Sequence, residues 1–194
     1  WEIEESEEEL LALLSVPSDE LEEMDLIKSL PRRRERLAVR AILNSLFEGK
    51  VYLGHHDNGR PYLQNSAIEI SISHTSRFAA ILTHPYESVG IDIERVSRDF
   101  TAVENRALSK GEIESLSDRE RNLHLAIFWS AKEAVYKRMS RSYIDFAKQI
   151  EIKRFTPRES GSLTAIYTGN EGLSQEFELS YELIEDHVMT WLIG

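Results

Sequence analysis

The chain of 194 residues contains no cysteine. This absence excludes disulfides, thiolate metal sites and a cysteine nucleophile, and it is typical of a cytoplasmic protein, which we expect this one to be. Long hydrophobic runs are also absent: no apolar stretch approaches the ~20 residues that span a bilayer, so we expect no membrane association. Flexible linkers and low-complexity segments are missing as well. The first residue is Trp1 rather than Met, and we expect a further segment upstream of it.

Positive charge is in the minority, with 23 Lys and Arg residues against 34 Asp and Glu residues and a net charge of −11. This balance argues against general nucleic-acid binding, which requires a basic surface. Five arginines nevertheless cluster between positions 32 and 40, after an acidic run over positions 2–25. The simpler interpretation of this cluster is a solvated helix face. The alternative is a basic patch that handles a phosphorylated ligand.

A hydrophobic fraction of 41% supports an ordinary packed core. Helical spacing of apolar residues predicts two long helices, over 32–47 and 124–139, and capping boxes that begin at Ser6 and Ser109 predict two further helix starts. Alternation of apolar and polar residues predicts strands. The predicted strands cover 51–53, 68–73, 78–83 and 88–94, then 149–155, 162–168, 175–184 and 187–193.

Helices therefore precede strands twice along the chain, which predicts an α+β protein. We expect two similar α+β halves, residues 1–87 and residues 88–194, that form a pseudo-dimer within one chain. Seams between such halves are frequent ligand sites, so we expect the ligand cleft at their interface.

Two carboxylates stand two residues apart in the sequence VGIDIE at residues 89–94. In a strand, Asp92 and Glu94 point the same way. Two adjacent carboxylates repel each other unless a cation lies between them, and Mg²⁺ is commonly bound by one or two carboxylates together with substrate phosphate. The alternative is an exposed edge strand with charged outward positions.

A helical segment, FWSAKEAVYK at residues 128–137, places Glu133 and Lys137 on one face. One interpretation is an exposed ion pair, which contributes only ~0.3–0.5 kcal/mol to stability. The other is that Glu133 completes a carboxylate triad with Asp92 and Glu94, which leaves Lys137 to meet a phosphate. Helical spacing alone does not decide between the two.

A polar strand end, ISISHT at residues 70–75, carries Ser73 and His74. A lone histidine there is more often structural, but with Arg60 in the nearby turn the two residues could form a phosphate pocket. Serine-hydrolase chemistry fits poorly, because adjacent Ser and His side chains do not readily face each other and no nucleophile-elbow motif is present.

Four motifs in order, GRP at 59–61, ISH at 72–74, VGIDIE at 89–94 and FWSAKEAVYK at 128–137, resemble those of the 4′-phosphopantetheinyl transferases. Within that superfamily the chain is similar to the monomeric surfactin-synthetase-activating type. The resemblance covers about positions 30–140. It implies transfer of 4′-phosphopantetheine from coenzyme A to a serine of an acyl or peptidyl carrier protein, with release of 3′,5′-ADP.

The resemblance also implies residue roles. Asp92, Glu94 and Glu133 would bind Mg²⁺, with Mn²⁺ as an alternative, and the ion would bridge to the coenzyme A pyrophosphate. Glu133 would help to deprotonate the carrier serine, and Lys137 would stabilise charge on the pyrophosphate. The 3′-phosphate and adenosine end of coenzyme A would be held by five residues: Arg36, Arg40, Arg60, Ser73 and His74.

Two other classes of function stay open at this point. The chain could be an inactive relative that binds coenzyme A without transfer, although its complete carboxylate set argues against this. It could also be an interaction scaffold in which the acidic N-terminal helix recruits a partner and the three carboxylates are unrelated surface charges.

Overall fold

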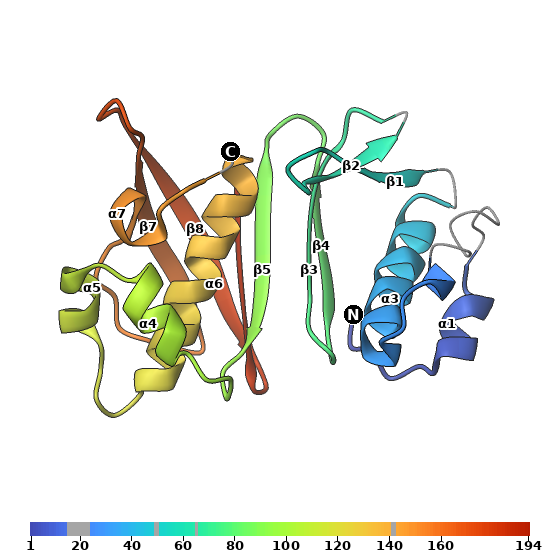
Figure 1. Ribbon diagram of the computed structural model, residues 1–194, viewed down its shortest axis with the longest axis horizontal. Coiled ribbons are helices and arrows are strands. Elements are labelled where there is room, and N and C mark those ends of the chain that lie inside the picture. The colour runs from blue at the N-terminus through green and yellow to red at the C-terminus, as the bar shows by residue number, and fades with distance from the viewer. Residues whose placement is uncertain (15–23, 49–50, 65, 141–142) are drawn as a thin grey trace.

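The structure is a computed structural model that describes residues 1–14, 24–48, 51–64, 66–140 and 143–194. It is a mixed α+β fold, as the sequence predicts (Figure 1). Helices precede strands twice along the chain, which confirms the predicted element order. No helix within the described ranges is long and apolar enough to cross a membrane.

The first part of the chain packs a long helix against short strands. Both oxygens of a capping box, from Ser6 and Glu9, satisfy backbone N–H groups at the start of the first helix, as predicted. Buried side chains from the helices and strands of this part form one hydrophobic cluster. The elements are α1 (Glu7–Ala12), α3 (Leu30–Leu46), β1 (Tyr52–His55), β2 (Pro61–Gln64), β3 (Glu69–His74) and β4 (Ala79–His84). β1 pairs with β2 and β3 pairs with β4, both antiparallel.

The second part is a five-stranded antiparallel sheet in the order β5-β9-β8-β7-β6. The longest helix, α6, lies across this sheet and buries residues on most of its circumference, because shorter helices cover its outer side (Figure 1). A second hydrophobic cluster fills this part. The elements are β5 (Val89–Arg95), α4 (Thr101–Ala107), α5 (Lys110–Ser115), α6 (Arg121–Met139), α7 (Phe146–Gln149), β6 (Ile150–Ile152), β7 (Ser160–Thr168), β8 (Ser174–Ile184) and β9 (His187–Ile193).

The two parts meet where β3 lies beside β5 (Figure 1). These strands belong to different sheets, and serine side chains bridge them. The Ile91 N–H donates to Ser71 Oγ at 3.0 Å, and the Ile93 N–H donates to Ser73 Oγ at 3.2 Å. Both serines are therefore buried. The side-chain oxygens replace the carbonyl acceptors that a continuous sheet would supply, since a buried N–H without an acceptor is costly.

Candidate functional site

The acidic face of β5 lies against α6. Gly90, Asp92 and Glu94 alternate onto one face of the strand. A Cβ atom placed on Gly90 would lie 2.0 Å from the carbonyl oxygen of Ala134 in α6, so the helix backbone packs directly on the strand at this point. Glu133 precedes Ala134. The close approach of strand and helix thus brings all three predicted carboxylates to one region.

Asp92 is the most buried of these carboxylates, with 4% of its surface exposed. Its Oδ1 accepts hydrogen bonds from Lys137 Nζ at 2.8 Å and from Ser73 Oγ at 2.9 Å. Lys137 also donates to the Ile91 carbonyl oxygen at 3.0 Å, which fixes the ammonium beside the strand. The second oxygen, Asp92 Oδ2, is buried and has no hydrogen-bond partner among the residues that the structure describes. A buried carboxylate oxygen left open in this way can accept a cation.

Glu94 has partners that the sequence analysis did not assign. Trp129 Nε1 donates to Glu94 Oε1 at 2.7 Å, and Arg98 donates to both carboxylate oxygens at 2.7 and 2.8 Å. Burial raises the pKa of Glu94, and the nearby Asp92 carboxylate adds to this effect. Arg98 opposes it.

Glu133 has the most altered carboxyl group in the site. Burial, followed by the Asp92 charge, raises the pKa of Glu133 to about 7, although Lys137 acts in the opposite direction. Asp92, Glu94 and Glu133 line one cavity of about 580 Å³. Within the described ranges, no three His, Asp or Glu side chains are grouped closely enough to hold a metal ion as they stand. Their chemistry still fits a hard divalent cation, because they supply oxygen donors and Asp92 Oδ2 is open.

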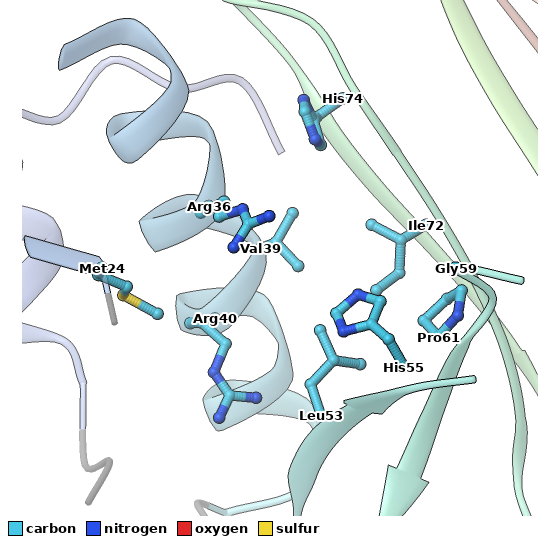
Figure 2. Close-up of a pocket in the computed structure, with 10 residues that line it drawn as sticks. All are labelled: Met24, Arg36, Val39, Arg40, Leu53, His55, Gly59, Pro61, Ile72 and His74. Atoms are coloured by element: carbon cyan, nitrogen blue, oxygen red, sulfur yellow. The ribbon is translucent and has the colours of Figure 1, made fainter. Parts of the chain in front are cut away.

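A second cavity, of about 370 Å³, lies beside α3 and holds three of the predicted phosphate-binding residues. Figure 2 shows Arg36 and Arg40 from α3 on one wall, and His74 at the end of β3 on the other. Arg36 is exposed, whereas Arg40 is 5% exposed, and burial lowers the pKa of its guanidinium. His74 Nδ1 lies 3.1 Å from a carboxylate oxygen of Glu35. Burial lowers the pKa of His74, while Glu35 works to raise it.

A third cavity, of about 230 Å³, has lining residues in common with each of the other two. It shares Ile72 with the cavity beside α3. It shares Glu133 with the cavity lined by the three carboxylates, which we call the acidic cavity, and Lys137 also lines it. Arg60 lies on its wall and pairs with Glu69 of β3. Arg40, Arg60, Lys137 and the carboxylates thus line three cavities that have lining residues in common.

The predicted site residues line these three cavities, with one difference in role for Ser73. Its hydroxyl donates to Asp92 and accepts from Ile93, so this side chain supports the acidic cavity and does not face the arginines. Three residues that contact the site were not assigned roles from sequence: Glu35, Arg98 and Trp129. Trp129 lies in the motif FWSAKEAVYK at residues 128–137, and Arg98 follows Glu94 by four residues. That spacing indicates a contact in a helix, but this segment leaves a strand.

The model of the 4′-phosphopantetheinyl transferase superfamily matches residues 88–192, just over half of the chain. No curated protein matches the chain. The matched segment begins one residue before β5 and includes Asp92, Glu94, Glu133 and Lys137. This protein therefore belongs to the 4′-phosphopantetheinyl transferase superfamily, whose members are transferases that use coenzyme A.

Proposed function

We propose that this protein transfers the 4′-phosphopantetheine group of coenzyme A to a serine of an acyl or peptidyl carrier protein and releases 3′,5′-ADP. The observation that carries the proposal is the cavity shared by Asp92, Glu94 and Glu133, with Lys137 bonded to its most buried carboxylate. The serine oxygen would bond to the phosphorus that bears the pantetheine. The bond from that phosphorus to the bridging pyrophosphate oxygen would break, and its electrons would leave with 3′,5′-ADP.

The acidic residues would hold Mg²⁺, or Mn²⁺ in its place. Asp92 Oδ2 is the open oxygen on the strand side, and Glu133 faces the same cavity from α6. A bound divalent ion would neutralise charge on the coenzyme A pyrophosphate. The fit is supported by the raised pKa values of Glu94 and Glu133, which result first from burial and second from the Asp92 charge, because a divalent ion would offset both effects.

Glu133 would accept the proton of the carrier serine, directly or through one water. The pKa of Glu133 is about 7 in the metal-free protein, and a divalent ion beside it would favour the ionised carboxylate, which is the form that accepts a proton. Lys137 would remain beside Asp92 and donate to the pyrophosphate as charge builds on the leaving group. These two residues come from one face of α6, so a single rigid element positions both.

The 3′-phosphate and adenosine of coenzyme A would lie in the cavity beside α3. The supporting observation is the gathering of Arg36, Arg40 and His74 on its walls (Figure 2). Arg60 would contact the ligand from the wall of the third cavity. The surfactin-synthetase-activating arrangement, a monomer of two halves at 1–87 and 88–194, is part of this proposal. Two separate hydrophobic clusters, one on each side of the β3–β5 contact, support it.

The decisive experiment incubates the protein with coenzyme A, Mg²⁺ and a panel of apo carrier proteins, with mass spectrometry as the readout. We expect one carrier to gain a single phosphopantetheine. Asp92→Asn, Glu94→Gln and Glu133→Gln should each reduce the rate by about 100-fold or more, and their combination should cost little further. Glu151→Gln, which alters an exposed carboxylate paired with Lys153, is the control and should keep its rate. Coenzyme A binding without transfer to any carrier would instead identify an inactive relative.

The phosphate cavity has its own test. His74→Ala and Arg60→Ala should raise the KM for coenzyme A by roughly 10- to 100-fold, which corresponds to one charge-assisted hydrogen bond. Both changes should raise the KM for dephospho-coenzyme A much less, because that ligand lacks the 3′-phosphate. The control is Arg32→Ala, which removes an exposed arginine from the start of the same helix α3. Equal losses with both ligands would show that His74 and Arg60 act elsewhere.

A further inference from the structure

The guanidinium of Arg98 holds Glu94 from the open side of the acidic cavity. One nitrogen, Nη1, donates to both carboxylate oxygens, at 2.7 and 2.8 Å. The Arg98 side chain is 47% exposed and extends over the ring of Phe100, with 5.5 Å between the guanidinium carbon and the ring centroid. Because the Arg98 side chain faces solvent, it can release Glu94 without disturbing the packing of the core.

The two carboxylates on β5 differ in what holds them. Asp92 accepts from Lys137 and Ser73 through one oxygen and keeps the other open. Glu94 has an arginine on both of its oxygens. The cavity lining contains a second arginine, Arg95, but that side chain pairs with Asp186 at 2.9 Å and turns away from the carboxylates. Arg98 thus supplies the positive charge that reaches Glu94.

We infer that Arg98 is an internal counter-ion that competes with the divalent metal for Glu94, and so sets the metal affinity of the site. The inference rests on the proposed function. In the metal-free protein the guanidinium holds the Glu94 carboxylate and offsets its repulsion by Asp92. A divalent ion at Asp92 and Glu133 recruits Glu94 only as that carboxylate leaves Arg98. The cost of breaking this pair lowers the metal affinity.

The test is a calorimetric titration of the folded protein with Mg²⁺, first alone and then with saturating coenzyme A and no carrier protein. Arg98→Gln removes the charge and keeps a polar side chain, and Mg²⁺ affinity should rise about fivefold, the size expected for a partly exposed ion pair. The metal-free variant should melt at a lower temperature than wild type, and Mg²⁺ should raise its melting temperature by more. Arg98→Lys, which retains the charge, should stay near the wild-type affinity.

The matched control is Arg95→Gln, which removes an equal charge from the same cavity lining without touching Glu94. Its Mg²⁺ affinity should change less than that of Arg98→Gln. Equal gains in the two variants would mean that only overall charge matters, and an unchanged or weaker affinity in Arg98→Gln would also overturn the inference. In both cases transfer activity and its dependence on Mg²⁺ would stand. A wild-type protein that binds no Mg²⁺ under either condition would overturn the metal role in the proposed function as well.

Discussion

His124 lies near the start of α6 and is almost fully buried, with 2% of its surface exposed. Its Nδ1 accepts the backbone N–H of Ser117 at 3.0 Å, and its ring stacks on Phe128 and meets the edge of Phe155. The acceptor role requires Nδ1 to be unprotonated. Burial lowers the pKa of this imidazole, and Phe155 and Glu120 only partly oppose the effect. Protonation would break the hydrogen bond and place a charge among aromatic rings.

This histidine predicts a pH dependence of stability. In the unfolded chain a histidine takes up a proton near pH 6.5, whereas folded His124 resists protonation until a lower pH. The unfolded state therefore binds more protons, and His124 contributes stability that is lost as the pH falls below about 6.5. We expect His124→Gln, followed by thermal unfolding between pH 7.5 and 5.5, to lose less stability on acidification than wild type does. His56→Gln, at an exposed site, should retain the wild-type slope. Equal slopes for His124→Gln and wild type would contradict the prediction.

At the residue scale, the sequence predicted those relative positions of side chains that depend on local geometry alone. Strand alternation put Asp92 and Glu94 on one face, and helical spacing put Glu133 and Lys137 on another. The contacts of Arg98 and Trp129 with Glu94, and of Glu35 with His74, were not predicted, because they depend on how separate segments pack. A single sequence carries no signal for the distance between an arginine in a loop and a carboxylate in a strand.

The elements around α6 are joined by one buried lysine. Lys132 Nζ donates to the carbonyl oxygens of Ala107, Phe146 and Ile150 at 2.8, 2.9 and 2.6 Å, and to Glu112 Oε2 at 2.8 Å. Glu112 in turn accepts from the Ile152 N–H at 2.9 Å. The end of α4, together with α5, α7 and β6, is therefore attached to α6 at one point. Burial lowers the pKa of Lys132, and Glu112 counteracts this.

Loss of either partner should weaken this junction strongly. Lys132→Met leaves the Glu112 carboxylate buried without its counter-ion, and we expect a loss of about 3–5 kcal/mol in the free energy of unfolding. Lys132→Met combined with Glu112→Gln should lose less than the sum of the two single changes, since the remaining group is uncharged. Denaturant unfolding measures all three. The exposed pair of Lys153 and Glu151 is the control, and Lys153→Met should cost less than about 1 kcal/mol. Additive losses at Lys132 and Glu112 would refute coupling between them.

Prediction of the elements succeeded where the signal lies within a few residues. Both capping boxes form, and the last predicted strand, 187–193, has the observed bounds of β9. β2 was not predicted, because Pro61 begins it and proline is disfavoured in strands except at their first residue or at an edge. The burial of Lys132 was not foreseen either. A lysine in a helical motif normally faces solvent, and its acceptors come from four separate elements.

At the scale of the whole molecule, the contact between β3 and β5 joins the two hydrophobic clusters. Its hydrogen bonds use serine side chains, so a substitution can remove them. The backbone hydrogen bonds between ordinary paired strands do not depend on the side chain in this way. Ser71→Ala removes the acceptor of the Ile91 N–H and leaves that buried group unsatisfied. We expect a loss of about 1–3 kcal/mol in stability and faster hydrogen exchange at the Ile91 amide. Ser162→Ala in β7, at an exposed position, should change neither quantity. An Ile91 amide that stays protected in Ser71→Ala would contradict this account of the seam.

The missing side chain at Gly90 has a consequence for interpreting other sequences of this superfamily. Any larger residue there would meet the Ala134 carbonyl oxygen, which is backbone and cannot rotate aside, so α6 would have to move away from β5. That movement would carry Glu133 away from Asp92, although the sequence would still contain all three carboxylates. If the proposed function holds, a related sequence that keeps all three carboxylates but has a larger residue at this position should bind the metal poorly. A check of the three carboxylates alone would not detect that loss.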